Sequence, residues 1–231
     1  MLIVGAMTIK RSAVILLGPP AGGKTTVANT VDEGDGVAII RTGHLLRSAV
    51  TTETESGREL KRHLEAGHLA PTKLVVQVIG AAIDAQKEDV LIFDGFPRLE
   101  DQIAPCFAML AEREVRLGGV LVLTLSDQEI QRRLSGRRAC PSCGASYHVD
   151  AQPPREDNRC DQCGSELVQR ADDAPDAIAK RLVVYGRETL PVVNYFKSQY
   201  SHLTEEISVE SSTDAACQAL REIIQRARRG G

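Results

Sequence analysis

Residues 18–25 read Gly-Pro-Pro-Ala-Gly-Gly-Lys-Thr and follow directly on the apolar run at residues 14–17. In this Gly-x4-Gly-Lys-Thr pattern, the glycines let backbone N–H groups surround phosphate oxygens and the lysine adds a full positive charge. A hydroxyl at Thr25 or Thr26 can reach a magnesium ion. The alternative is a Gly- and Pro-rich turn with a chance lysine, but the apolar run before the loop and the helix-forming residues after it favour a phosphate site. The segment therefore predicts binding of a nucleoside triphosphate.

Four of the six cysteines form two Cys-x-x-Cys-Gly units, Cys140 with Cys143 and Cys160 with Cys163. Each unit presents two thiolates to one point, and two units together make a tetrahedral zinc site. Because four protein ligands leave no open coordination position, the predicted zinc is structural. The surrounding segment has few large apolar residues, so metal binding would replace a hydrophobic core. Two disulfides or redox-active pairs are the alternative, which a cytosolic chain disfavours.

A set of arginines provides candidates for phosphate contacts, because a guanidinium makes planar, permanently charged, bidentate contacts to phosphate oxygens. The set comprises Arg47, Arg98, Arg133, Arg137, Arg170 and Arg181. The last four flank the cysteine segment, and arginines at the hinges of an insertion can close over a nucleotide and expel water. A solvated arginine on a helix face is the alternative for each one taken alone, so only the group supports this interpretation.

The elements that must position these residues alternate along the chain. Apolar runs typical of buried strands lie at residues 14–17, 37–40, 89–93, 120–125 and 207–209. Helical patterns cover residues 72–85, 101–116, 175–200, with a bend near Pro191, and 214–228, and residues 126–129 form a capping box. This alternation predicts an α/β fold with a parallel sheet flanked by helices. Its ligands should bind beyond the carboxyl ends of the strands, where the phosphate loop and Asp94 fall.

Two stretches do not fit this alternation, namely residues 42–71, which are helical and polar, and residues 138–170, which are rich in Cys, Pro, Gly and Asn. We interpret both as insertions that project from the sheet. The 231-residue chain has a net charge of −3, 3% aromatic residues and no Trp, which disfavours a nucleic-acid-binding surface. Its apolar stretches are too short to span a bilayer, and Lys10 and Arg11 follow the apolar start instead of preceding it, unlike a secretory signal. We therefore expect a cytoplasmic protein without nucleic-acid or membrane partners.

With these motifs in place, residues 13–200 resemble the adenylate kinases in their long-lid, zinc-containing form. The matching segments are the phosphate loop, Thr-Gly-His-Leu-Leu-Arg at 42–47, Gly-His-Leu-Ala-Pro at 67–71, Asp-Gly-Phe-Pro-Arg at 94–98 with Gln102, Arg-Leu-Ser-Gly-Arg-Arg at 133–138, the four cysteines, Arg-Ala-Asp-Asp at 170–173, and Arg181. The resemblance implies a P-loop nucleoside monophosphate kinase fold. Its core would comprise residues 11–41, 72–136 and 171–231, with a monophosphate-binding insertion at 42–71 and a small zinc-ribbon-like lid at 137–170.

The resemblance also implies a phosphotransferase that catalyses ATP + AMP ⇌ 2 ADP and maintains the adenine nucleotide balance, as a monomer whose partners are ATP, AMP and ADP. The catalytic residues implied are Lys24, Arg98, Arg137, Arg170 and Arg181. The ATP site implied is Ala21, Gly22, Gly23, Lys24, Thr25, Thr26, Arg133, Arg137, Ser146 and Tyr147. The AMP site implied is Thr42, Arg47, His68, Leu69, Ala70, Gly95, Phe96, Pro97, Arg98, Gln102, Arg170 and Arg181. Mg²⁺ bound with ATP is assigned to Thr25 and Asp94, and Zn²⁺ to the four cysteines.

Three residues depart from the family pattern. Ala21-Gly22 stands where Gly-Ala is usual, and Thr25 replaces a usual glycine. His44 replaces a usual aspartate and so removes a carboxylate near the phosphates; we interpret it as a polar residue at a helix start without a role. Two other functions remain open at this point: another nucleoside monophosphate kinase, or a non-catalytic ATP-binding protein whose zinc ribbon binds a partner.

Overall fold

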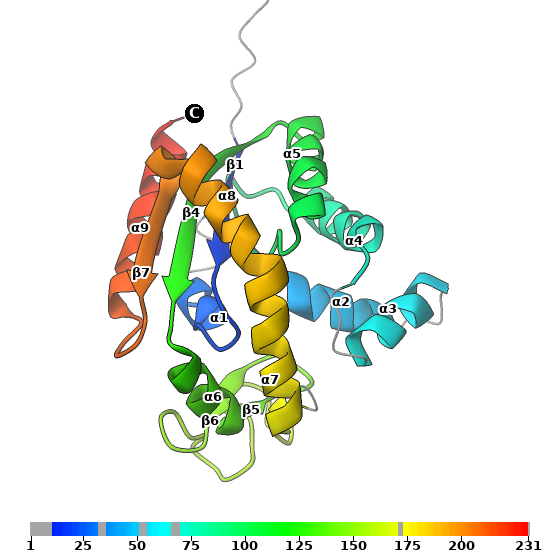
Figure 1. Ribbon diagram of the computed structural model, residues 1–231, viewed down its shortest axis with the longest axis vertical. Helices are drawn as coiled ribbons and strands as arrows, with labels where there is room; N and C mark the ends of the chain where they lie inside the picture. Colours follow the sequence, from blue (N-terminus) through cyan, green and yellow to red (C-terminus); the bar gives the residue numbers. More distant parts are fainter. Residues whose placement is uncertain (1–10, 32–35, 51–54, 66–69, 171–172, 231) are drawn as a thin grey trace, which may run out of the picture.

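The computed structural model describes residues 11–31, 36–50, 55–65, 70–170 and 173–230 (Figure 1). Its centre is a five-stranded sheet in the order β2-β3-β1-β4-β7. The strands are β1 (Arg11–Leu17), β2 (Val37–Arg41), β3 (Val90–Asp94), β4 (Val115–Thr124) and β7 (Thr204–Ser208). All neighbouring pairs in this sheet are parallel, which confirms the predicted α/β architecture.

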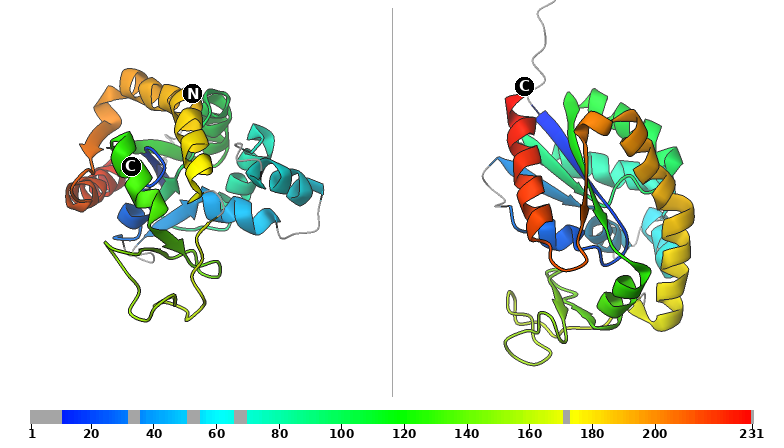
Figure 2. Two further views of the ribbon diagram at one scale, coloured as in Figure 1. Left: turned by 60° about the horizontal axis from the view of Figure 1, so that its bottom comes forward. Right: turned by 60° about the vertical axis from the view of Figure 1, so that its left-hand side comes forward.

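Helices cover both faces of the sheet, because its strands are apolar on both sides (Figure 2). Helices α1 (Lys24–Ala28) and α9 (Asp214–Arg229) lie on one face, and α4 (Thr72–Asp84), α5 (Ile103–Glu112) and α8 (Leu190–Gln199) lie on the other. Alternate residues of β1 point to opposite faces of the sheet. Ile15 and Leu17 pack into the core with α4, α5 and α8. Val14 and Leu16 pack against α1 and α9. Each such buried side chain contributes about 1.5–3 kcal/mol to folding. This packing fixes the strand ends that carry the site.

The helix predicted over residues 101–116 is wrong at both ends. A short 3-10 turn, η1 (Glu100–Gln102), precedes α5, and after α5 ends the chain turns at Glu114 with a left-handed φ of 53°. β4 then begins at Val115, five residues earlier than the strand expected from residue 120. The intervening glycines gave no apolar signal. They are required because an added Cβ would lie 2.7 Å from Ala227 Cβ at Gly118 and 2.4 Å from Ile223 Cγ2 at Gly119, so α9 packs directly on this strand.

The long helical region predicted over residues 175–200 is present, with its irregularity slightly before Pro191. It consists of α7 (Pro175–Val184), a π-helical turn η3 (Tyr185–Thr189) and α8. Pro191 has no N–H to donate to the carbonyl four residues earlier, and the wide turn accommodates this missing hydrogen bond. A 3-10 turn, η4 (Ser201–Leu203), then connects α8 to β7.

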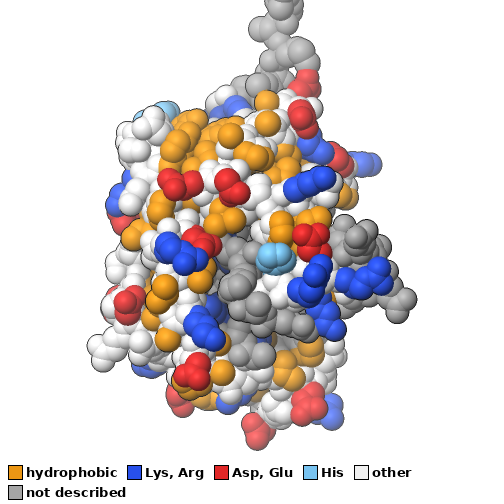
Figure 3. All heavy atoms as spheres, turned by 45° about the vertical axis from the view of Figure 1, so that its right-hand side comes forward, with side chains coloured by type: hydrophobic (Ala, Val, Ile, Leu, Met, Phe, Trp, Pro, Cys, Tyr) orange, Lys and Arg blue, Asp and Glu red, His pale blue; other side chains and the backbone are white. Residues whose placement is uncertain are grey.

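The predicted helical insertion contains two helices among its described residues, α2 (Thr42–Val50) and α3 (Glu55–Glu65). α2 begins directly after β2, so the carboxyl end of that strand leads into the insertion. α3 carries Arg58, Lys61 and Arg62. Figure 3 shows basic side chains (blue) beside the part of the molecule that projects at the right of the view.

The cysteine-rich insertion forms a small separate layer beyond α6 (Asp127–Ser135) at the bottom of Figure 1. Strands β5 (Arg137–Ala139) and β6 (Ser146–His148) pair antiparallel, and an isolated bridge joins Ala139 to Val168. Its buried cluster consists only of Cys140, Ala145, Tyr147, Cys160 and Leu167. So small a core agrees with the expectation that a metal replaces one here.

Candidate active site

The phosphate loop connects the end of β1 to α1 and is held in a shape that needs small residues. Gly18 has a φ of 142°, and an added Cβ there would lie 2.6 Å from the carbonyl oxygen of Leu123. Gly23 and Ala21 adopt left-handed φ angles of 77° and 55°. Because alanine carries a Cβ, its left-handed φ costs free energy that the usual glycine would avoid.

Lys24 points back into this loop, where its ammonium group donates hydrogen bonds to the carbonyl oxygens of Gly18 at 2.8 Å and Pro19 at 2.7 Å. The residue keeps some accessible surface, but its ammonium is enclosed by protein. This burial, followed by the nearby Arg98, lowers the pKa of Lys24 to about 7, while Asp94 opposes the shift. Arg181 and Arg137 lower the same pKa further, so the positive charges of these three arginines all act on the Lys24 ammonium.

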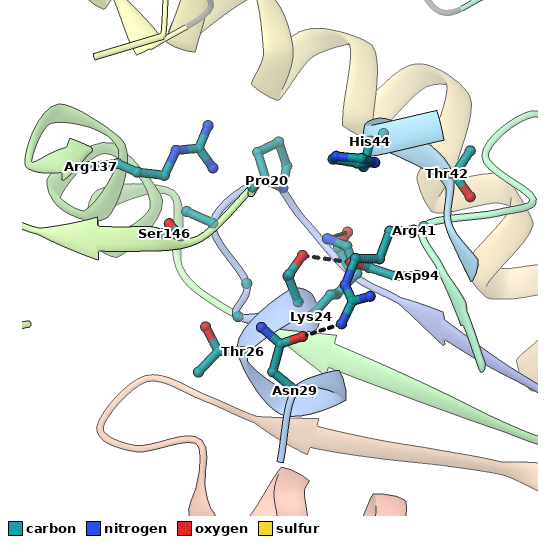
Figure 4. Close-up of a pocket in the computed structure, with 18 of the residues that line it drawn as sticks. Pro20, Lys24, Thr26, Asn29, Arg41, Thr42, His44, Asp94, Arg137 and Ser146 are labelled. Atoms are coloured by element: carbon teal, nitrogen blue, oxygen red, sulfur yellow. Dashed lines mark hydrogen bonds between the residues drawn. The ribbon is translucent and has the colours of Figure 1, made fainter. Parts of the chain in front are cut away.

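Asp94 ends β3, at the edge of the sheet where the phosphate loop leaves β1. The register pairs Leu16 of β1 with Asp94, and the Thr25 hydroxyl donates to Asp94 Oδ2 at 2.6 Å. A hydroxyl and a carboxylate are hard oxygen ligands of the kind that Mg²⁺ takes together with substrate phosphates. Beside them, the Arg41 guanidinium donates to Asn29 Oδ1 at 2.8 Å (Figure 4). Sequence reasoning overlooked this pair because neither residue belongs to a recognised motif.

Arg98 is fixed by the turn that follows β3. Its Nε donates to the Gly95 carbonyl at 2.7 Å, and its backbone N–H donates to Gln102 Oε1 at 2.8 Å. Gly95 has a left-handed φ of 80°, which favours glycine, and an added Cβ would lie 2.5 Å from the Arg98 guanidinium and displace it. At the end of the neighbouring strand β2, Thr42 is 4% exposed, and its hydroxyl has no hydrogen-bond partner among the described residues. An unpaired buried hydroxyl costs free energy unless a ligand satisfies it.

Asp173 connects two of the predicted arginines. Its carboxylate accepts two hydrogen bonds from Arg137, at 2.7 and 2.5 Å, and one from Arg181 at 2.8 Å. The Asp173 side chain has no exposed surface, so this is a buried ion triad at the entrance to the cysteine-rich insertion. We assigned Asp173 no role from the sequence, because nothing local shows that one carboxylate joins arginines 36 and 8 residues away.

Arg133 lies on α6 with its guanidinium paired to Glu129 at 2.8 Å, and it also donates to the carbonyl of Val209 at 2.5 Å. Hydrogen bonds from Arg132 and Arg133 lower the pKa of Glu129 to about 2. The predicted capping box is therefore half correct: Ser126 Oγ accepts from the Glu129 N–H, but the Ser126 N–H donates to Glu210 instead.

Most of the predicted site residues line one cleft of about 960 Å³ between the sheet edge and the two insertions. Figure 4 shows Arg137 and Ser146 on one side, Thr42 and His44 on the other, and phosphate-loop residues between them. The predicted site residues that border the cleft are Ala21, Gly22, Gly23, Lys24, Thr25, Thr26, Thr42, Arg47, Ala70, Asp94, Gly95, Phe96, Arg98, Gln102, Arg133, Arg137, Ser146, Tyr147, Arg170 and Arg181. Pro97 follows Phe96 through a cis peptide bond and does not border the cleft, and His68 and Leu69 lie outside the described residues.

His44 also borders the cleft, in an exposed position at the start of α2. A Cβ on Gly144 would lie 3.3 Å from His44 Cδ2, so the first cysteine turn of one insertion meets the first helix of the other. The cleft is thus covered where the two insertions approach each other.

The four predicted metal ligands converge. Their sulfur atoms lie within 4.8 Å of one another, with 3.4 Å between Cys140 and Cys163 and 3.5 Å between Cys143 and Cys160. Zn–S bonds of about 2.3 Å in a tetrahedron place the sulfurs about 3.8 Å apart, close to this arrangement. All four cysteines are free thiols, so the pairs are not disulfides. The donor set therefore fits zinc in a closed, four-thiolate site.

None of the helices in the described ranges is long and apolar enough to cross a membrane. Comparisons with known proteins agree with the geometry. A family model described as "Adenylate kinase" matches residues 16–201. An adenylate kinase of Archaeoglobus fulgidus is 37% identical over 80% of this chain and 86% of its own length. Those of Salinispora tropica and Clostridium perfringens are 38% and 34% identical and cover 90% and 92% of this chain, and 97% and 94% of their own. The chain therefore belongs to the adenylate kinase family, and the matched residues include its glycine-rich loop, the arginines that border the cleft and the four cysteines.

Proposed function

We propose that this chain catalyses the reversible reaction ATP + AMP ⇌ 2 ADP. The observation that carries the proposal is that Lys24, Arg98, Arg137, Arg170 and Arg181 all line one cleft. Phosphoryl transfer requires little covalent chemistry from the protein, and depends on positioning two anions and neutralising the charge that moves between them. Two nucleotides repel each other strongly, and a concentration of fixed cations in one cleft overcomes that repulsion.

The ATP side of the site is the phosphate loop. Its backbone N–H groups and Lys24 hold the β- and γ-phosphates, so Lys24 exchanges its present carbonyl partners for phosphate oxygens. Thr25 and Asp94 hold Mg²⁺, which supplies charge neutralisation between the phosphates. Arg133 lies along the adenine, and Ser146 of β6 borders the ATP side of the cleft next to Arg137 (Figure 4).

The AMP side is formed by the start of α2 and the turn after β3. Arg47 and Arg98 hold the AMP phosphate, and the geometry around Gly95 supports this role because it fixes the Arg98 guanidinium beside the cleft. The unpaired hydroxyl of Thr42 and the buried amide of Gln102 recognise the base. The remaining residues of this side are His68, Leu69, Ala70, Phe96 and Pro97.

Arg137, Arg170 and Arg181 close over the transferring phosphoryl group, and Asp173 holds two of them in position. We assign the core to residues 11–41, 72–136 and 171–231, the AMP-binding insertion to 42–71 and the lid to 137–170. Zinc bound by Cys140, Cys143, Cys160 and Cys163 gives the lid its shape. Because side chains of a single chain complete the cleft, we propose that the enzyme acts as a monomer, and that it does so in the cytoplasm without nucleic-acid or membrane partners.

A coupled assay of ADP formation from MgATP with AMP, UMP, CMP or GMP in turn tests the proposal. We expect rapid turnover with AMP and little with the other three. Lys24→Met serves as the control, because it keeps the length of the side chain and removes its charge. Preference for UMP or CMP would assign a different monophosphate kinase activity, and absence of ADP formation with every acceptor would refute catalysis.

A further inference from the structure

The two cysteine turns share one backbone geometry. In the first, the Cys140 N–H donates to Ala145 O at 2.8 Å and the Gly144 N–H donates to Cys140 O at 3.1 Å. In the second, the Cys160 N–H donates to Ser165 O at 2.9 Å and the Gly164 N–H donates to Cys160 O at 2.8 Å. Differences between the two halves of the centre therefore come from side chains.

Four thiolates and one Zn²⁺ leave a net charge of about −2 on the centre, and hydrogen-bond donors around the sulfurs must stabilise that charge. Cys140 Sγ accepts from the Cys143 N–H at 3.5 Å, and Cys163 Sγ lies 3.4 Å from the Ser165 hydroxyl. Cys160 is buried, and its Sγ lies 3.5 Å from the hydroxyl of Tyr147, a residue of β6.

The direction of the hydrogen bond follows from the second partner of Tyr147. Its hydroxyl oxygen accepts a hydrogen bond from the Asp161 N–H at 2.8 Å. That bond uses the oxygen as acceptor and leaves the hydroxyl proton for a second partner. A metal-bound thiolate has no proton to donate, so the proton of Tyr147 is directed to Cys160 Sγ.

We propose that Tyr147 is a positioning residue of the metal centre, whose hydroxyl donates to the Cys160 thiolate while the residue forms part of the wall of the nucleotide cleft. The buried hydroxyl of Tyr147 thus stabilises the metal centre through Cys160. Any contact of Tyr147 with ATP is made by the part of the residue that borders the cleft. The inference rests on zinc binding by the four cysteines. It is independent of catalysis, because its test measures the metal and the thiolates.

Tyr147→Phe removes only the hydroxyl. Loss of an outer-shell partner weakens metal binding by about 10- to 100-fold, so we expect a decrease of this size in zinc affinity, measured by competition with a chromogenic chelator. In the Co²⁺-substituted protein the thiolate-to-metal absorption should move to lower energy, because an unscreened thiolate loses an electron more readily. Tyr195→Phe is the matched control, since it removes the same hydroxyl from α8, outside the lid.

Site-resolved alkylation separates positioning from a general loss of structure. In the zinc-loaded Tyr147→Phe protein, iodoacetamide should modify Cys160 faster relative to Cys140 than in the unsubstituted protein, as mapped by mass spectrometry. Ser165→Ala should instead favour modification of Cys163. Zinc affinity within twofold of the unsubstituted protein, or equal relative alkylation at Cys160, would overturn the proposal.

If Tyr147→Phe does not fold, a second pair of variants tests the hydrogen bond from the Asp161 N–H that orients the Tyr147 hydroxyl toward Cys160 Sγ. Asp161→Pro removes the N–H that Tyr147 accepts, and the first turn already has Pro141 at the equivalent position. Asp161→Ala keeps the N–H but removes the same carboxylate, which accepts from the Arg155 N–H. We expect Asp161→Pro to bind zinc at least threefold more weakly than Asp161→Ala, and equal affinities would contradict the assigned geometry.

Discussion

Neutralising Asp173 is the perturbation that most directly probes how the lid arginines are held. In Asp173→Asn, Arg137 and Arg181 lose their shared counter-charge beside Lys24 and Arg98, and the new amide directs N–H groups at a guanidinium. Removing one partner of a buried ion pair costs about 3–5 kcal/mol. The Arg137 and Arg181 side chains are 14% and 22% exposed, so solvent partly screens their charges. We therefore expect a loss of unfolding free energy at the lower end of this range, about 3 kcal/mol.

The same substitution should lower kcat, since a displacement of catalytic groups by about 1 Å can cost roughly 100-fold. Urea unfolding followed by circular dichroism gives the free energy of unfolding, and the coupled assay gives kcat. Asp176→Asn is the control, because this exposed carboxylate also lies at the start of α7 and its loss should change stability by less than about 0.5 kcal/mol. ATP should stabilise Asp173→Asn more than the unsubstituted protein, since phosphate replaces the missing negative charge. If both variants unfold at the same urea concentration and retain full kcat, Asp173 does not hold these arginines.

Three further predictions concern the cations and the metal. Arg98→Ala should lower the rate at saturating AMP by at least roughly tenfold, from the loss of one charge-assisted contact of about 1.5 kcal/mol or more, and an unchanged kcat in the coupled assay would exclude its role. The pKa of Lys24 is lowered to about 7, and a bound phosphate should raise it. ATP binding at pH 8 should therefore be accompanied by uptake of a proton, and ATP affinity should fall as the pH rises further. Binding heats measured by calorimetry that do not depend on the ionisation enthalpy of the buffer would contradict this. The purified protein should contain about one zinc per chain, and chelation should expose four titratable thiols and lower the melting temperature, whereas metal-free native protein with four reactive thiols would refute the structural zinc.

The pH dependence of Lys24 has a defined sign for stability as well. Its pKa is lowered in the folded protein from an ordinary value of 10.5 to about 7, so between these values the unfolded chain binds more protons than the folded chain. Considered alone, Lys24 therefore makes folding more favourable as the pH rises from 7 to 10.5. Below pH 7 it destabilises the folded protein by a constant amount, because the buried ammonium stays charged. Phosphate binding removes this penalty by supplying counter-charge.

Local patterns were sufficient for the elements and motifs whose causes are local. The run before the phosphate loop is apolar because β1 is buried on both faces, and the Cys-x-x-Cys-Gly turns depend only on their own backbone. The start of β4 was missed because Gly118 and Gly119 are there to admit Ala227 and Ile223 of α9, a requirement set by residues more than 100 positions away.

For the same reason, the sequence did not predict which side chains pair across the fold. Asp173 could be quoted as part of a motif, but its pairing with Arg137 depends on the lid returning to the core. Tyr147 was assigned to ATP from the resemblance, and only the folded lid shows its hydroxyl beside Cys160. Asn29 and Arg41 lie in separate elements that the sheet brings together. Pairings of this kind become visible only once the topology is known.

A double-label transfer experiment with the unsubstituted enzyme tests whether the phosphoryl group passes directly between two nucleotides in one cleft. ATP labelled with ³²P at the γ-phosphate is mixed with AMP labelled with ¹⁴C in its adenine, and the products are separated during the first turnovers. If one cleft holds both nucleotides and passes the phosphoryl group directly, ³²P and ¹⁴C appear together in ADP in a 1:1 ratio. Release of ³²P as inorganic phosphate, with ¹⁴C remaining in AMP, would instead show that the phosphoryl group is transferred to water and not to AMP.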